Sequence, residues 1–313
     1  MTLAAGDALA QNTGEIPRRK LGRTGESVSC VGLGGFHIGE PKDLQTSTKI
    51  IRTAIDSGIN FMDNCWDYHD GKSEDWMGQA LANGYRSKVY LMSKIDGRDK
   101  KTAAKQIEES LKRLLTDRID LMQMHEIIRP GEPEQIFRSG GAMEALVEAQ
   151  KAGKVRHIGF TGHKDPKIHL ATLKVAAARN FQFDTVQMPL NVMDAHYNSF
   201  EKMVLPELVK QNIGVLGMKP LGGGEILKSS TTSAEDCLRY ALNLPTSVVI
   251  SGCETLERLQ QLVKVARSFQ KLDQTQVNAL LAKTRDAAQK GQFELYKTSE
   301  KFDGTTKNPQ WLG

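Results

Sequence analysis

Eight short apolar runs, spaced roughly 30 residues apart, constrain the fold of this chain more than any other feature. They end near residues 33, 63, 94, 125, 161, 187, 219 and 251 and are bounded by Gly, Asp or Asn. The runs are apolar on both faces, which is typical of strands buried on both sides of a parallel sheet. The predicted strands are 28–33, 59–63, 89–94, 119–125, 155–161, 185–187, 213–219 and 247–251.

Helix signals fill the gaps between these runs. Residues 46–57 are followed by Gly58, a residue that favours the end of a helix, and a second helix opens at 73–75 with two acids in its first turn. Strands that alternate with helices predict an α/β fold, specifically a single-domain (β/α)8 TIM barrel. Further helices are expected at 101–115, 142–152 and 233–243.

The alternative fold is a doubly wound sheet, which usually carries Gly-x-Gly-x-x-Gly after its first strand. Here the first run continues as Gly32-Leu33-Gly34-Gly35-Phe36-His37, which lacks the third glycine. We therefore expect a flexible N-terminal tail at 1–16 and one barrel domain at 17–313. After a helix at 274–289, the polar segment 302–313 is expected to lie over the barrel as a C-terminal arm.

Composition disfavours several functional classes. The net charge of +5 is spread over 313 residues, and the short basic clusters lack interleaved aromatic residues, so we expect no nucleic-acid partner. Four cysteines without a Cys-x-x-Cys pair disfavour a disulfide scaffold or zinc ribbon. No apolar stretch is long enough to span a membrane.

The N-terminal residues bear on localisation. Residues 8–10 read Ala-Leu-Ala and resemble a signal-peptidase site, but the basic start and the long apolar region of an export signal are missing. We expect a cytoplasmic protein. The alternative is an exported protein whose N-terminus is the remnant of a truncated signal.

Four polar residues stand at or just beyond the ends of three consecutive runs. Asp63 closes the second run, Tyr68 follows it by five positions, and Lys94 and His125 close the third and fourth runs. In a barrel the C-terminal ends of neighbouring strands meet at one rim, where active sites form. These four side chains are therefore expected to converge.

The four groups suit the protonation of a carbonyl oxygen. A lysine ammonium about 4 Å from a tyrosine favours phenolate by roughly 4 kcal/mol at an effective dielectric near 20, so Lys94 is expected to lower the pKa of Tyr68. Asp63 would hold Lys94 charged and oriented, and His125 would hydrogen-bond the oxygen. No metal is required. Taken singly, each residue also has an ordinary structural interpretation. Asp63 is typical of a helix cap, Tyr68 of a core tyrosine, Lys94 of a solvated strand end and His125 of a buried imidazole.

The chain resembles the aldo-keto reductases, from Arg18 to the C-terminus. The segment 19–25, followed by 31–34, is similar to the family's opening hairpin and first strand, and 61–68 matches its aspartate–tyrosine segment. The five-residue interval from Asp63 to Tyr68 is diagnostic. The resemblance implies that Asp63, Tyr68, Lys94 and His125 form the catalytic tetrad, that NADPH (with NAD possible) is the cofactor, and that carbonyl groups are reduced reversibly.

The resemblance also implies cofactor-binding positions at the ends of later strands. Gln187 would bind the nicotinamide carboxamide, Met218 would pack on the ring, glycine-rich 218–224 would cover the pyrophosphate, and Arg258 would bind a 2′-phosphate. Each is also typical of an ordinary strand, loop or solvated helix position. The full set is Thr161, His163, Gln187, Met218, Lys219, Pro220, Leu221, Gly222, Gly224, Gly252, Cys253, Glu254, Arg258 and Gln261.

Some positions depart from the family pattern. The fifth run ends in Thr161-Gly162-His163 instead of Ser-Asn, so either His163 replaces the amide contact or one hydrogen bond is lost. His69 follows the tyrosine where glycine is usual. Gly252 and Leu262 stand where Lys and Asn are frequent, which weakens the preference for NADP over NAD. Substrate-wall residues are expected at Phe36, His37, Trp66 and His69.

The favoured function is an NADPH-dependent oxidoreductase acting on a small-molecule aldehyde, ketone or keto-sugar, as a monomer or homo-oligomer. One alternative is a catalytically silent barrel that binds NADPH as a redox sensor or regulatory subunit. Another is a metal-dependent hydrolase or isomerase that uses His37, Asp67, His69 and His163, although their spacing matches no known metal pattern.

Overall fold

The computed structural model describes residues 14–313 of the chain. The signal-like residues 8–10 and nearly all of the predicted flexible tail at 1–16 lie outside the described residues, so both stay predictions. Within 14–313, no helix has the length and apolar character needed to cross a membrane.

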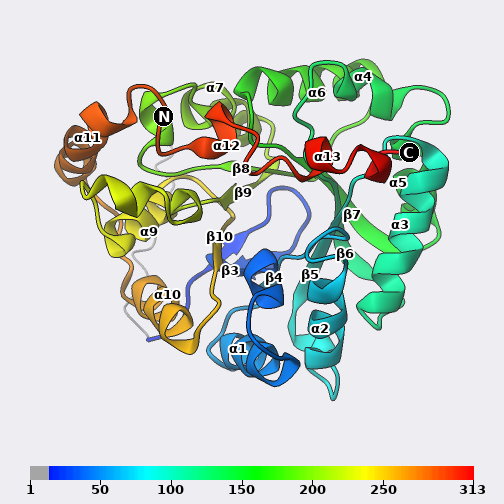
Figure 1. The fold of residues 1–313 in the computed structure, drawn as a ribbon, viewed down its shortest axis with the longest axis horizontal. Helices are drawn as coiled ribbons and strands as arrows, with labels where there is room; N and C mark the ends of the chain where they lie inside the picture. Colours follow the sequence, from blue (N-terminus) through cyan, green and yellow to red (C-terminus); the bar gives the residue numbers. More distant parts are fainter. Residues whose placement is uncertain (1–13) are drawn as a thin grey trace, which may run out of the picture.

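Eight parallel strands of the described chain close into a barrel in the order β10-β3-β4-β5-β6-β7-β8-β9 (Figure 1). Each of the eight predicted runs contributes one of these strands, so the barrel is confirmed. The strands are β3 Val31–Gly34, β4 Phe61–Met62, β5 Tyr90–Ile95, β6 Ile119–Met124, β7 Val155–Thr161, β8 Thr185–Pro189, β9 Gly214–Met218 and β10 Val248–Gly252.

The first predicted run, 28–33, is divided in the structure. Its beginning belongs to β2 (Ser27–Ser29), which pairs antiparallel with β1 (Arg18–Lys20), and only its second part enters the barrel as β3. The backbone turns at Cys30, whose N–H donates to the carbonyl of Pro17. Reading 28–33 as one strand was therefore wrong, because a continuous apolar pattern does not show where a buried chain changes its pairing partner.

Helices surround the barrel, and the predicted ones are present with boundaries shifted by a few residues. Helix α1, for example, begins before residue 46 because the Asp43 carboxylate accepts the N–H of Thr46 and caps it. The helices are α1 Leu44–Asp56, α2 Lys72–Ala80, α3 Lys100–Arg113, α4 Glu132–Phe137, α5 Ala142–Lys151, α6 Pro166–Ala178, α7 Phe200–Met203, α8 Leu205–Lys210, α9 Ala234–Asn243, α10 Leu256–Ser268, α11 Gln274–Ala288, α12 Leu295–Thr298 and α13 Gly304–Lys307.

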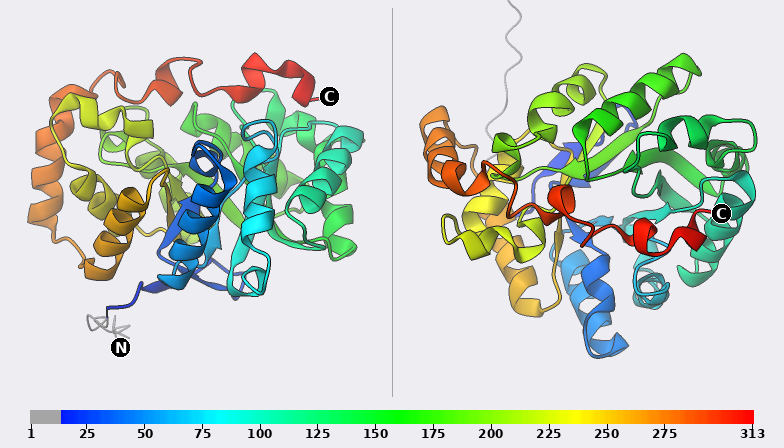
Figure 2. Two further views of the ribbon diagram at one scale, coloured as in Figure 1. Left: turned by 60° about the horizontal axis from the view of Figure 1, so that its bottom comes forward. Right: turned by 45° about the horizontal axis from the view of Figure 1, so that its top comes forward.

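The two ends of the barrel are covered differently. The β1–β2 hairpin covers the N-terminal end, where Leu21 and Val28 pack on barrel residues such as Phe61 and Leu216. The segment that follows α11, residues 289–313, crosses the opposite end (Figure 2) and is called the C-terminal arm below. The predicted arm at 302–313 is confirmed as the last part of this segment. The open rim of the barrel therefore lies beneath the arm.

Candidate active site

The structure brings together three of the four predicted catalytic side chains in direct contact. Asp63 follows β4, Tyr68 lies in the next loop, and Lys94 lies near the end of β5, which pairs with β4. The Lys94 side chain is only 1% exposed. Its ammonium donates to Asp63 Oδ1 at 2.5 Å, to the Asn64 carbonyl at 2.7 Å and to Tyr68 Oη at 3.1 Å. All three N–H bonds of Lys94 are thus used, which fixes a buried cation beside the phenol.

The structure does not support the expected lowering of the Tyr68 pKa by Lys94. The pKa of Tyr68 is raised well above its ordinary value, first by burial of the phenol and then by the negative charge of Asp63. Desolvation and neighbouring acids therefore outweigh the single ammonium, and the predicted lowering of this pKa was wrong. Tyr68 is a neutral phenol whose O–H remains available as a proton donor.

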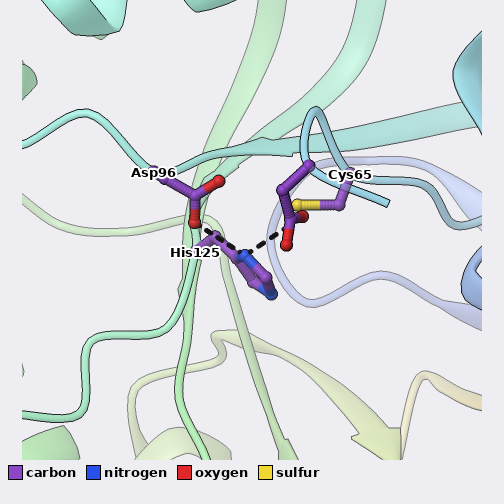
Figure 3. Close-up of side chains that lie close together, drawn as sticks. Cys65, Asp96 and His125 are labelled. Atoms are coloured by element: carbon purple, nitrogen blue, oxygen red, sulfur yellow. Dashed lines mark hydrogen bonds and ion pairs between the residues drawn. The ribbon is translucent and has the colours of Figure 1, made fainter. Parts of the chain in front are cut away.

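His125 completes the group from the end of β6. Its ring lies edge-on to the Tyr68 ring, with centroids 5.8 Å apart. The imidazole Nδ1 lies 2.9 Å from Asp96 Oδ1 and 3.5 Å from Asp67 Oδ1, and Figure 3 shows Asp96 and Cys65 beside the ring. Burial alone lowers the pKa of His125, but the charges of Asp67 and Asp96 outweigh it and raise this pKa.

Asp96 was not identified from the sequence, and Asp67 was considered solely as a possible metal ligand. Their positions carry a signal, since Asp67 directly precedes Tyr68 and Asp96 follows Lys94 by two residues. Burial, and then the charge of Asp96, raise the pKa of Asp67 to about 7. Two acids and an imidazole therefore form a titrating group at the rim.

The predicted cofactor residues on β7 and β8 occupy the same rim. Gln187 donates from Nε2 to Asp63 Oδ2 at 3.0 Å, and its buried Oε1 has no hydrogen-bond partner among residues 14–313. Thr161 is buried, with its hydroxyl 3.9 Å from the sulfur of Met218. His163 is hydrogen-bonded through Nε2 to Asp303 of the C-terminal arm at 2.9 Å. Nε2 of His163 is therefore engaged by the arm, and the role of this residue toward a cofactor stays a prediction.

The loop after β9 places a cation at the rim. The Lys219 ammonium lies 5.2 Å from the Phe302 ring and 5.9 Å from the Tyr296 ring, and it has no acceptor or ion-pair partner among the described residues. Burial lowers the pKa of Lys219 to about 8. The loop continues through buried Pro220 and partly buried Leu221 into the turn Gly222–Gly224, where all three glycines have positive φ.

The loop after β10 carries the remaining predicted cofactor residues. A side chain at Gly252 would collide with the His37 ring, so this position requires glycine for His37 to lie where it does. Cys253 is buried. Glu254 pairs with Arg258 at 3.1 Å, and the Arg258 side chain is 61% exposed. Gln261 is exposed on α10. Arg258 is therefore accessible to a ligand from solvent.

Three of the predicted substrate-wall residues form one cluster, which contacts Tyr68 through Phe36. The Phe36 ring lies edge-on to Tyr68 at 5.4 Å and contacts His37 and His69. Trp66 does not join them. Its indole N–H donates to Glu109 on α3 at 2.7 Å, and its ring packs against Trp311 of the arm.

The residues of the metal-dependent alternative do not form one group. Among residues 14–313, the His, Cys and acidic side chains that cluster closely are Cys65, Asp67, Asp96 and His125 in one place, and His37, Glu40 and Glu254 in another. His69 instead contacts the carbonyl of Phe36, and His163 contacts Asp303. The proposed set of His37, Asp67, His69 and His163 is not supported.

The C-terminal arm is fastened across the rim by buried polar contacts. Glu126, the residue after His125, accepts hydrogen bonds from the backbone N–H groups of Gly304 and Thr305. Asp303 pairs with both His163 and Lys164. The arm is thereby tied to the ends of β6 and β7, the same strand ends that carry His125 and Thr161.

Comparisons with known proteins find similarity to aldo/keto reductases and other oxidoreductases. A family model described as "Aldo/keto reductase family" matches residues 30–236. The uncharacterized oxidoreductase YrpG of Bacillus subtilis is 31% identical over 224 residues, which cover 65% of this chain and 66% of that protein. The L-galactose dehydrogenase of Arabidopsis thaliana is 26% identical over 308 residues, covering 84% of this chain and 92% of that protein.

The fold of this chain is also similar to that of a solved structure. The holo form of an aldo-keto reductase from Bacillus halodurans superimposes with a TM-score of 0.72 at 20% identity, covering 86% of this chain and 96% of that one. At this level of identity the similarity concerns the fold alone.

Proposed function

Because the chain belongs to the aldo/keto reductase family, we propose that it is an NADPH-dependent oxidoreductase that reduces the carbonyl of an aldehyde, ketone or keto-sugar. The observation that carries this proposal is the set of contacts around Lys94. One buried ammonium bridges Asp63 and Tyr68 at 2.5 and 3.1 Å, which places a phenol O–H next to a fixed positive charge.

The residues at the rim fit a nicotinamide dinucleotide. Gln187 Oε1 is a buried acceptor that lacks a donor among the described residues, and a carboxamide N–H₂ would supply one. The ammonium of Lys219, which has no ion-pair partner among residues 14–313, suits a phosphate oxygen, and the exposed guanidinium of Arg258 suits a 2′-phosphate. When bound, NADPH supplies the hydride that adds to the carbonyl carbon.

The protein's own residues manage the proton and the developing charge. Tyr68 donates its O–H to the carbonyl oxygen as negative charge develops there. The phenolate that results is stabilised by the Lys94 ammonium, which is already in place and needs no rearrangement. Phe36, from η1 (Phe36–Gly39), packs edge-on against the Tyr68 ring, and His69 packs against Phe36 in turn.

An NADPH-oxidation screen over aldehydes, quinones, steroids and keto-sugars tests the proposal. We expect Tyr68→Phe to remove most of the turnover and to leave the affinity for NADPH, measured by nicotinamide fluorescence, nearly unchanged. Tyr90→Phe is the matched control, since Tyr90 is buried inside the barrel but packs against Phe61 far from the rim, in the core below the site. Equal turnover for Tyr68→Phe and the parent would refute the role of Tyr68. NADPH binding without turnover on any substrate would favour the silent-sensor alternative.

A further inference from the structure

The two acids that flank His125 have no role in the mechanism above. Asp96 comes from the end of β5 and Asp67 from the loop after β4, and both face Nδ1 of the imidazole. The three side chains are largely shielded from solvent, with exposed fractions of 0% for Asp96 and 9% for both Asp67 and His125. Acidic side chains are rarely placed in such surroundings unless a partner carries positive charge.

Each acid also keeps a buried oxygen that makes no hydrogen bond among the described residues, although that of Asp67 is the oxygen 3.5 Å from His125 Nδ1. Asp67 Oδ1 and Asp96 Oδ2 make no hydrogen bond within residues 14–313. Other oppositely charged groups nearby are engaged elsewhere. The Arg98 guanidinium binds Glu132 and the backbone carbonyls around His125, and the Lys94 ammonium has used all three of its N–H bonds. His125 is therefore the group that can compensate the two carboxylates.

The position of the acids at Nδ1 restricts the protonation state of the ring. A carboxylate accepts hydrogen bonds and donates none, so Nδ1 must carry a proton where it faces Asp96. A neutral imidazole protonated at Nδ1 has a bare Nε2, which cannot donate to a carbonyl oxygen. A ring that donates from Nε2 as well must carry a second proton and hence a positive charge.

We propose that Asp96 and Asp67 are positioning residues that hold His125 as an imidazolium, so that its Nε2–H hydrogen-bonds the substrate's carbonyl oxygen beside Tyr68. This inference rests on the proposed reductase function. Asp96 is the main partner because its oxygen lies closer to Nδ1. Asp67 adds a weaker second charge, since its pKa of about 7 leaves it partly ionised at pH 7. The carbonyl oxygen then meets two donors, the phenol O–H and the imidazolium N–H, and the charge that develops on it is stabilised from both sides.

The charged surroundings of His125 agree with this assignment. Glu126, two residues beyond the end of β6, adds a third acid and is itself bound by the arm. The Cys65 thiol stays neutral because burial raises its pKa. The carboxylates raise the pKa of His125 despite its burial. Loss of one carboxylate should thus move the titration of the ring to lower pH.

The first test measures the charge of the ring directly. Side-chain ¹⁵N NMR of the full chain, with His125→Gln used to assign the resonance, should show an imidazolium at pH 7. In Asp96→Asn the same titration should move to lower pH, and in Asp67→Asn it should move less. A neutral His125 ring at pH 7 in the parent protein would overturn the proposal. This measurement does not depend on turnover, so it separates failure of the inference from failure of the proposed function.

The second test uses kinetics with whichever carbonyl substrate the screen identifies. We expect Asp96→Asn to lower kcat about 100-fold, to leave the NADPH affinity unchanged, and to shift the high-pH limit of kcat to lower pH. Asp99→Asn is the matched control, since Asp99 lies three residues further on and caps α3, a role that Asn also fills. A reduced kcat with an unshifted pH profile would indicate a merely structural role and contradict the proposal.

A third measurement addresses the alternative that the two acids serve a metal ion together with Cys65 and His125. Elemental analysis of the purified protein, with and without added Zn²⁺, should find no stoichiometric metal. The parent protein and Cys65→Ser should therefore have the same metal content. One equivalent of such a metal would mean that the carboxylates are ligands, and it would overturn the assignment of His125 as an imidazolium.

Discussion

The buried pair of Lys94 and Asp63 permits a quantitative test of the site's construction. At a separation of 2.5 Å and an effective dielectric near 20, the Coulomb attraction amounts to about 7 kcal/mol, much of which offsets the desolvation of two charges that are 1% and 4% exposed. Removing one partner leaves the other charge buried and unpaired. We therefore expect Lys94→Met and Asp63→Asn each to lower the free energy of unfolding by about 3–5 kcal/mol.

The double variant removes both charges and should cost less than the sum of the single variants. We expect a coupling energy of about 2–3 kcal/mol, obtained from urea unfolding followed by circular dichroism at pH 7. The control cycle uses Lys100→Met and Glu148→Gln, since this pair has the same 2.5 Å separation but side chains that are 40% and 61% exposed. Solvent screening should make its coupling small. Additive losses in the buried cycle, or equal coupling in both cycles, would refute the reasoning.

Three further predictions concern the cofactor and the arm. Arg258→Met should weaken NADPH binding about tenfold or more and leave NADH binding unchanged, because NADH lacks the 2′-phosphate; equal losses for both nucleotides in fluorescence titrations would contradict the assignment. Burial lowers the pKa of Lys219 to about 8, so the affinity for NADPH should fall as the pH rises through 8. The Lys219→Met variant should bind NADPH weakly at every pH and should show no such fall. Burial alone raises the pKa of Glu126, but His125, His163 and the contacts with Thr305 lower it to about 2. The Glu126 carboxylate therefore stabilises the fold above its unfolded pKa, and about 3 kcal/mol of the free energy of unfolding is lost as the pH falls from about 4.5 to 2. Urea unfolding of Glu126→Gln should show a smaller loss over that range. A loss equal to that of the parent protein would refute this role of Glu126.

The sequence predicted the barrel because its evidence is local and repeated. Each βα unit carries its own apolar run and helix signals, so an error in one unit, such as the run 28–33, leaves the others intact. The convergence of Asp63, Tyr68 and Lys94 followed from the barrel, because parallel strand ends meet at one rim. Their position along the chain was sufficient to place them.

The electrostatic properties of the site could not be read in the same way. The charge on a side chain depends on burial and on groups that the fold brings from distant parts of the chain, as Asp303 is brought to His163 across 140 residues. One Lys–Tyr contact suggested an acidic phenol, but burial and the acids around it reverse that expectation. The sequence by itself determined the architecture and predicted Asp63, Tyr68, Lys94 and His125 at the rim, but it did not point to Asp96. Only the tertiary structure decided which of them are charged, because desolvation and Coulomb interactions act through space and not along the chain.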